Sequence, residues 1–134
     1  MLAKVENLVG DLAGKKLAVL GLSFKPETDD MRESPAADII NAIKAKGSAV
    51  KAFDPVAMDE ASHCIEGIEF ATDEYDAIEG ADALIIVTEW NQFRALDMQR
   101  VKSLLKQPKI ADLRNIYEPA DMREMGFEYV GVGR

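Results

Sequence analysis

Three cationic side chains are the first candidates for a chemical role in this sequence. Lys25 and Arg32 lie in a polar stretch of residues 22–33, and Arg114 follows a predicted strand at residues 109–111. Arginine grips a phosphate through the two arms of its planar guanidinium, and lysine attracts it as a mobile point charge. These residue types therefore favour a ligand that carries phosphate groups, such as a diphosphate.

Each cation also has an ordinary structural interpretation. Lys25 could be a solvated surface lysine, as most lysines are. Arg32 could pair with an acid of its own loop, and Arg114 could form an ion pair with the nearby Asp112. The residue types alone leave these alternatives open.

Other reactive residue types are assigned structural roles. Asp54 is similar to the acid that holds a ribose in dinucleotide-binding folds, but Pro55 follows it, which favours a turn or a cap. Trp90 is interpreted as a packing residue. Cys64 adjoins His63, but sequence neighbours do not face each other on a helix, so a nucleophile–base pair is disfavoured. No catalytic residue and no metal site are predicted.

The composition narrows the classes of partner. The chain carries 16 Lys and Arg against 24 Asp and Glu, which gives a net charge of −8. A nucleic-acid surface requires a basic stripe, and no apolar run approaches the length that spans a membrane, so neither partner is expected. The single cysteine cannot form an internal disulfide and fits a reducing, cytoplasmic compartment.

Strands and helices are predicted to alternate along the chain. Short apolar runs predict strands, and apolar residues at helical spacing predict helices. The predicted N-caps are Ser34, Thr72 or Asp73, and Asp97, and the predicted end of the first helix is Gly14. The predicted strands are residues 16–21, 49–53, 68–70, 83–87, 109–111 and 127–132, and the predicted helices are residues 2–12, 34–46, 73–78, 97–105 and 119–125, with a further helix and loop within 56–67. This alternation predicts an α/β fold, a Rossmann-like three-layer sandwich with a doubly wound, mainly parallel sheet.

The predicted sheet brings the three cations to one edge. Ligands of such sheets bind outside the carboxyl ends of the strands, where Lys25, Arg32 and Arg114 would all lie. Gly21 ends the first strand, but no G-x-G-x-x-G fingerprint follows it. Cationic side chains, rather than the backbone of a glycine-rich loop, are therefore expected to hold the phosphates.

Four motifs occur in order along nearly the whole chain. They are LAVLGLSFKPETDDMRESPA at residues 17–36, FDP at 53–55, VTEWNQF at 87–93 and DLRNIY at 112–117. Together they resemble the C-terminal, UDP-binding domain of the UDP-glucose/GDP-mannose dehydrogenase family. The last two are most similar to the UDP-glucose branch.

The resemblance implies a function and a set of contacts. The parent enzyme would oxidise the C6 alcohol of UDP-glucose to a carboxylate with two molecules of NAD. Phe24, Lys25 and Arg114 resemble residues that contact the nucleotide sugar, and Arg32 resembles an arginine that reaches the NAD diphosphate.

It also implies a division of the chain and a set of partners. Residues 1–13 would end a central linker helix, and residues 14–134 would form the nucleotide-sugar-binding domain. A separate N-terminal domain would bind most of the NAD, and the full-length enzyme would be a homodimer.

The departures from the family pattern bear on activity. The family's catalytic cysteine lies in a glycine-rich motif upstream of this domain, and Cys64 does not match it. Because covalent catalysis needs that thiol and hydride transfer needs bound cofactor, this chain alone is expected to be inactive. Two alternatives remain: the same domain of a UDP-N-acetyl-hexosamine or GDP-mannose dehydrogenase, or a free-standing, non-catalytic nucleotide-binding module.

Overall fold

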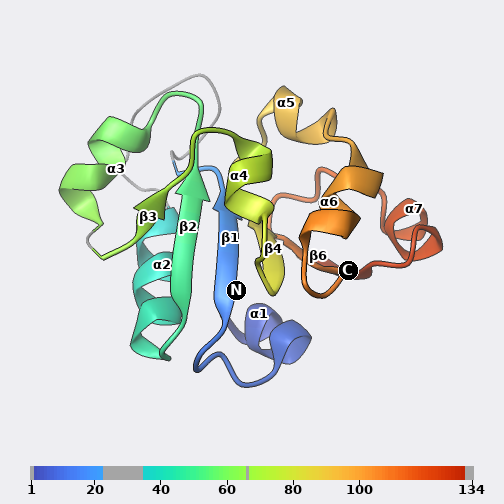
Figure 1. Ribbon diagram of the computed structural model, residues 1–134, viewed down its shortest axis with the longest axis horizontal. Helices are drawn as coiled ribbons and strands as arrows, with labels where there is room; N and C mark the ends of the chain where they lie inside the picture. Colours follow the sequence, from blue (N-terminus) through green and yellow to red (C-terminus); the bar gives the residue numbers. More distant parts are fainter. Residues whose placement is uncertain (1, 23–34, 66, 132–134) are drawn as a thin grey trace.

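The computed structural model describes residues 2–22, 35–65 and 67–131 of the chain (Figure 1). Within these ranges, six strands form one sheet in the order β3-β2-β1-β4-β5-β6, and every neighbouring pair is parallel. The strands are β1 (Lys16–Leu20), β2 (Ala49–Phe53), β3 (Glu69–Phe70), β4 (Ala83–Ile86), β5 (Lys109–Asp112) and β6 (Glu128–Gly131). The order reverses between β1 and β4, which confirms the predicted doubly wound sheet.

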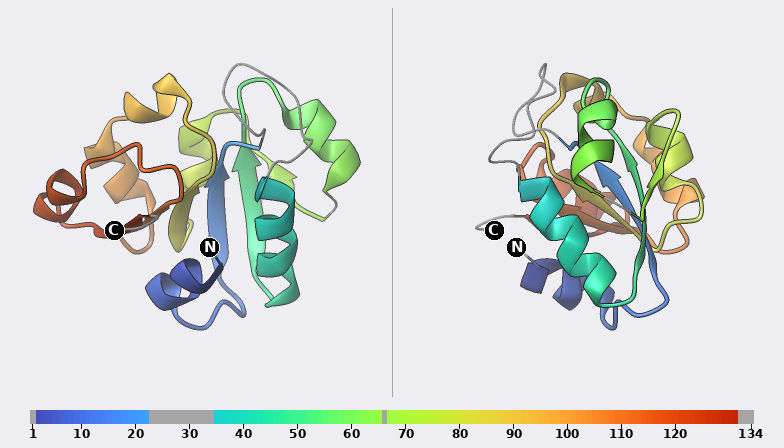
Figure 2. Two further views of the ribbon diagram at one scale, coloured as in Figure 1. Left: turned by 180° about the vertical axis from the view of Figure 1, so that it is seen from behind. Right: turned by 90° about the vertical axis from the view of Figure 1, so that its left-hand side faces the viewer.

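Helices cover both faces of the sheet, as Figure 2 shows when the sheet is seen from its edge. The helices are α1 (Leu2–Val9), α2 (Pro35–Ala45), α3 (Met58–Cys64), α4 (Glu74–Ile78), α5 (Asn91–Arg94), α6 (Met98–Leu104) and α7 (Pro119–Glu124). Side chains of α1, α2 and α3 join one apolar cluster, and those of α4 to α7 join the other. Right-handed crossovers place α2 and α3 on one face and α4 to α7 on the other, because the chain winds in opposite directions on the two sides of β1.

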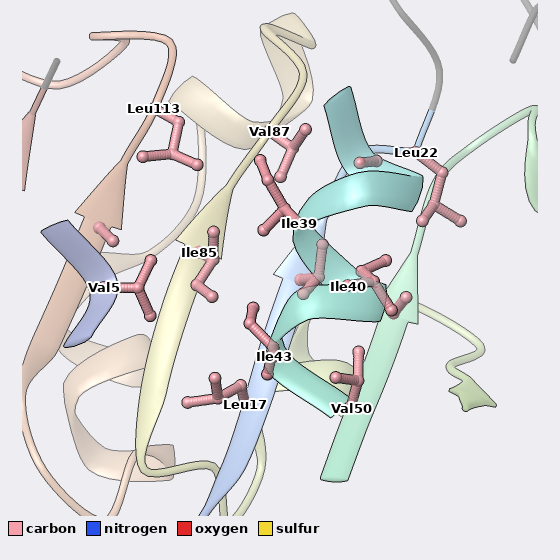
Figure 3. Close-up of a cluster of buried hydrophobic side chains, with 14 of the residues drawn as sticks. Val5, Leu17, Leu22, Ile39, Ile40, Ile43, Val50, Ile85, Val87 and Leu113 are labelled. Carbon is pink, nitrogen blue, oxygen red and sulfur yellow. The ribbon is translucent and has the colours of Figure 1, made fainter. Parts of the chain in front are cut away.

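The sheet is apolar on both faces because it lies between these two layers. All four residues of β4 are buried, and β1 is buried from Leu17 onward. On the α2 face, Ile40 and Ile43 pack over the strands near Leu17 and Ile85 (Figure 3). Continuous apolar runs of this kind are typical of parallel strands.

Helix α1 covers a part of the sheet that the crossovers leave bare. The connections to β5 and β6 run over the opposite face, whereas α1 packs against β5 and β6 on the α2 face. Val5 of α1 points toward the sheet near Ile85 (Figure 3) and is fully buried. The predicted division of the chain at residues 13 and 14 therefore falls just after an element that contributes to this core.

Some element limits differ from the prediction. The first helix ends at Val9 rather than near residue 12, because Gly10 takes a φ of 86°. Helix α5 was not predicted, and it has only four residues and no side-chain cap. Of the two predicted cap candidates for α4, Thr72 and Asp73, the cap is Asp73, which accepts a hydrogen bond from the Asp76 amide. The predicted cap Asp97 is confirmed, because it accepts from two amides at the start of α6.

Candidate functional site

The carboxyl ends of β1 and β4 meet at the point where the strand order reverses. Gly21 follows β1 with a φ of 98°, and a Cβ atom on it would lie 2.4 Å from Oγ1 of Thr88, which follows β4. A side chain at position 21 would therefore collide with a buried residue of the neighbouring strand end. Glycine keeps these two strand ends in close contact at the place where doubly wound folds bind ligands.

Asp54 has a structural role at the end of β2. Its carboxylate is fully buried; Oδ2 accepts from the Leu22 amide at 2.8 Å, and Oδ1 accepts from the amides of Val56 and Ala57, both at 2.9 Å. These bonds join the chain after β1 to the turn before α3. The interpretation of Asp54 as a turn or cap residue is confirmed.

A second buried carboxylate shapes the loop after β5. Asp112 Oδ2 accepts from the Tyr129 hydroxyl at 2.7 Å and from the Tyr117 amide at 2.9 Å. Its Oδ1 accepts from the Arg114 amide at 3.1 Å. Asn115 takes a φ of 55° inside this tight loop. The backbone of Arg114 is therefore held by the last residue of β5 and, through Tyr129, by β6.

The Arg114 side chain reaches across to the loop after β4. Its Nη2 atom lies 3.0 Å from Oε1 of Glu89, and the two side chains are 27% and 40% exposed. Arg114 thus pairs with Glu89 rather than with Asp112, which contacts only its backbone amide. The sequence alternative of an Asp112–Arg114 ion pair was wrong.

Glu89 is the residue of this edge that the sequence did not single out. It lies 25 positions before Arg114, so no local pattern links the two. The available signal was that both residues follow strands of one parallel sheet, whose carboxyl ends share an edge.

Trp90 packs beneath the carboxyl edge of the sheet, and its predicted packing role is confirmed. It is 9% exposed and belongs to the same apolar cluster as Phe93 and Leu96. Its indole Nε1 atom is buried and has no hydrogen-bond partner among the residues that the structure describes. Tyr117 lies in the same cluster and donates its hydroxyl to the Phe93 carbonyl.

Three of the four predicted site residues lie outside the described residues. Phe24, Lys25 and Arg32 fall between Leu22 and Pro35, as does Ser34, the predicted cap of α2. Their roles stay predictions, and Arg114 alone can be placed. In the described ranges, no group of three or more His, Cys, Asp or Glu side chains has the arrangement of a metal site. None of the helices there combines the length and apolar character that crossing a bilayer requires.

Comparison with known proteins adds a family to this geometry. Residues 18–119 match the UDP-binding domain of the UDP-glucose/GDP-mannose dehydrogenase family. A UDP-glucose 6-dehydrogenase of Rhizobium meliloti (strain 1021) is 51% identical over 125 residues, which cover 93% of this chain and 29% of the relative. The chain therefore spans less than a third of the length of that protein.

Solved structures share the fold over nearly the whole chain. An NDP-N-acetyl-D-galactosaminuronic acid dehydrogenase from Methanosarcina mazei Go1 superposes with a TM-score of 0.83 at 27% identity, covering 99% of this chain and 27% of that one. A UDP-glucose dehydrogenase from the archaeon Pyrobaculum islandicum gives a TM-score of 0.79 at 28% identity, over 98% of this chain and 28% of its own.

Proposed function

The chain belongs to the UDP-glucose/GDP-mannose dehydrogenase family, and we propose that it is the nucleotide-sugar-binding C-terminal domain of a UDP-glucose 6-dehydrogenase. The identity of 51% to a relative of that name supports the choice of UDP-glucose over other sugars. The chain supplies substrate contacts, and the parts that perform oxidation lie elsewhere in the parent enzyme.

One observation carries the proposal at the level of geometry. Arg114 is a partly exposed arginine at the carboxyl edge of the sheet, where its backbone amide donates a hydrogen bond to Asp112 and its side chain pairs with Glu89. Doubly wound sheets bind ligands at this edge, and the guanidinium fork suits nucleotide oxygens. We assign Arg114 to the UDP-sugar site, together with Phe24 and Lys25.

The remaining assignments follow from the parent enzyme. Arg32 reaches the diphosphate of an NAD molecule that a separate N-terminal domain holds. Residues 1–13 continue a linker helix from that domain, and the complete enzyme is a cytoplasmic homodimer. Two molecules of NAD accept the electrons as UDP-glucose becomes UDP-glucuronate. Without the N-terminal domain, the chain catalyses no step of this oxidation.

Three other assignments are considered. The structural similarity to an NDP-N-acetyl-D-galactosaminuronic acid dehydrogenase supports a domain that accepts an N-acetylated sugar. The domain could also belong to a GDP-mannose dehydrogenase of the same family. A non-catalytic nucleotide-binding module would have the same fold but no dehydrogenase sequence upstream in its gene.

Titration of the purified chain with UDP, UDP-glucose, UDP-N-acetylglucosamine and GDP tests the proposal. We expect weak binding of the UDP compounds, around the millimolar range, because much of the pocket belongs to the rest of the enzyme. Arg114→Ala should weaken UDP binding by about tenfold, the effect of losing a charge-assisted hydrogen bond. Arg123→Ala, which removes an exposed arginine of α7, is the matched control.

The outcomes separate the alternatives. Tighter binding of GDP than of UDP would reject a UDP-sugar domain, and submicromolar UDP binding would show that the pocket is complete without the missing parts. Addition of NAD and UDP-glucose should produce no NADH absorbance. Turnover by the chain alone would reject the assignment of catalysis to the missing parts.

A further inference from the structure

The pairing of Arg114 with Glu89 affects how this arginine can meet a ligand. A guanidinium carries five N–H donors, and the structure shows one of its terminal nitrogens, Nη2, bonded to Glu89 at 3.0 Å. Both side chains are partly exposed, at 27% and 40%. The pair can therefore be reached from solvent, and donors of Arg114 remain for a second acceptor.

The charge around Arg114 is already balanced by acids. Glu89 faces its guanidinium, and the buried carboxylate of Asp112 lies beside its backbone amide. The chain as a whole carries a net charge of −8. An anion that approaches Arg114 therefore meets a compensated cation, and its electrostatic attraction is weaker than for an unpaired arginine.

We propose that Glu89 is a positioning residue for Arg114: it holds the guanidinium at the sheet edge and offsets its charge, so that Arg114 serves the ligand mainly as a directional hydrogen-bond donor. This inference rests on the proposed function, because it concerns the same nucleotide site. Glu89 thereby lowers the preference of the site for a charged diphosphate over an uncharged nucleoside. The remaining ligand charge must be met by other cations.

Two substitutions separate the positioning role from the charge. Glu89→Gln keeps the length and an acceptor oxygen but removes the charge, whereas Glu89→Ala removes both. Glu128→Gln is the matched control, because it removes one negative charge beside Lys109 at the amino ends of β5 and β6, away from Arg114. The Lys109 Nζ and Glu128 Oε2 atoms are 3.9 Å apart. Trp90 is the only tryptophan and adjoins Glu89, so its fluorescence and its indole N–H NMR signal report binding.

Uridine and UDP are the probes, titrated into the full chain and the three variants at low and high salt. Glu89→Gln should raise the affinity for UDP roughly two- to fivefold and leave uridine binding unchanged, and the gain should shrink at high salt. Glu89→Ala should weaken uridine binding by about threefold, because Arg114 is no longer held. Glu128→Gln should match the parent chain for both ligands.

Other outcomes would overturn the inference. If Glu89→Gln and Glu128→Gln have the same ratio of UDP to uridine affinity, the pair is an ordinary surface ion pair. If Glu89→Ala binds uridine as the parent does, Glu89 does not position Arg114. Either result leaves the proposed function intact, provided that Arg114→Ala still weakens UDP binding. If the parent chain shows no response to UDP, the proposed function fails and this inference fails with it.

Discussion

The contact between Gly21 and Thr88 is a site where one added methyl group should be costly. A Cβ on Gly21 would lie 2.4 Å from Oγ1 and 2.5 Å from the backbone nitrogen of Thr88, and the φ of 98° also disfavours other residues. The backbone atom cannot move aside as a flexible side chain would. We expect Gly21→Ala to lower the free energy of unfolding by about 3 kcal/mol, measured by urea denaturation.

Gly80→Ala is the matched control for this prediction. Gly80 also has a positive φ, 75°, but nothing lies within 4 Å of the position that its Cβ would take. Gly80→Ala should therefore lower the free energy of unfolding by only about 1 kcal/mol, which is the cost of the left-handed backbone conformation. Equal losses in the two variants would show that backbone conformation, and not the close approach of the strand ends, dominates at Gly21.

At the level of single residues, the sequence predicted local roles and missed a non-local one. Asp54 was interpreted correctly because Pro55 beside it is a local turn signal. Arg114 was placed at the correct edge, but its partner was not identified, because Glu89 lies 25 positions away. Such a pairing depends on how the two loops after β4 and β5 are shaped, and no sequence spacing encodes that shape.

Helix α1 should stabilise the domain through its buried face alone. Val5 is fully buried against the sheet, whereas Asn7 of the same helix is exposed. We expect Val5→Ala to lower the free energy of unfolding by about 2 kcal/mol, from lost apolar burial and the cavity that remains. Asn7→Ala should change it by less than about 0.5 kcal/mol. Urea denaturation of both variants measures the difference.

A comparison of the two variants tests the role of the whole helix. If Val5→Ala is as stable as Asn7→Ala, then α1 does not contribute to the core, and residues 1–13 are separable from the rest. The expected difference would instead mean that a chain beginning at residue 14 exposes the apolar face of β5. Such a truncated chain should bind more of a hydrophobic dye than the full chain does.

The elements themselves were largely predictable, and the exceptions have local causes. All six strands were predicted from the sequence. The central strands β1 and β4 are nearly continuous apolar runs because helices cover both of their faces, whereas β2 and β6 alternate buried residues with more exposed ones. Helix α5 was missed, since four residues form little more than one turn and Trp90 at its start offers no side-chain cap. The early end of α1 follows from the positive φ of Gly10, whereas the sequence predicts that the helix continues to Gly14.

At the scale of the whole molecule, the doubly wound arrangement of the sheet was inferred from a rule of handedness and not from any residue. Alternating strands and helices with right-handed crossovers favour a doubly wound sheet, and the observed order is one such arrangement. The sequence carried no comparable rule for how α1 would pack. Its position over β5 and β6 follows from the need to cover apolar strands that the crossovers leave exposed.

The stability of the whole molecule should depend on pH through two groups, Tyr117 at alkaline pH and Asp76 at acid pH. Burial, helped by the nearby charge of Asp112, raises the pKa of Tyr117 above its ordinary value of 10.0. The stabilisation from neutral Tyr117 is therefore complete below about pH 10 and is lost as the pH rises toward the folded-state pKa.

Asp76 behaves oppositely, because a hydrogen bond from the Thr72 amide and another from Lys51 lower its pKa below 3.8. Its contribution is present above that value and is lost as the pH falls.

Urea denaturation from about pH 3 to about pH 11 measures both effects in variants that act as controls for each other. Tyr117→Phe also loses the hydrogen bond to the Phe93 carbonyl, so it should be less stable at neutral pH. Its stability should nevertheless fall less than that of the parent chain above pH 10, while its acid limb is unchanged. Asp76→Asn should flatten only the acid limb. An alkaline limb that is the same in Tyr117→Phe and the parent would mean that another group controls alkaline unfolding, and that burial of the Tyr117 phenol contributes no pH-dependent stability.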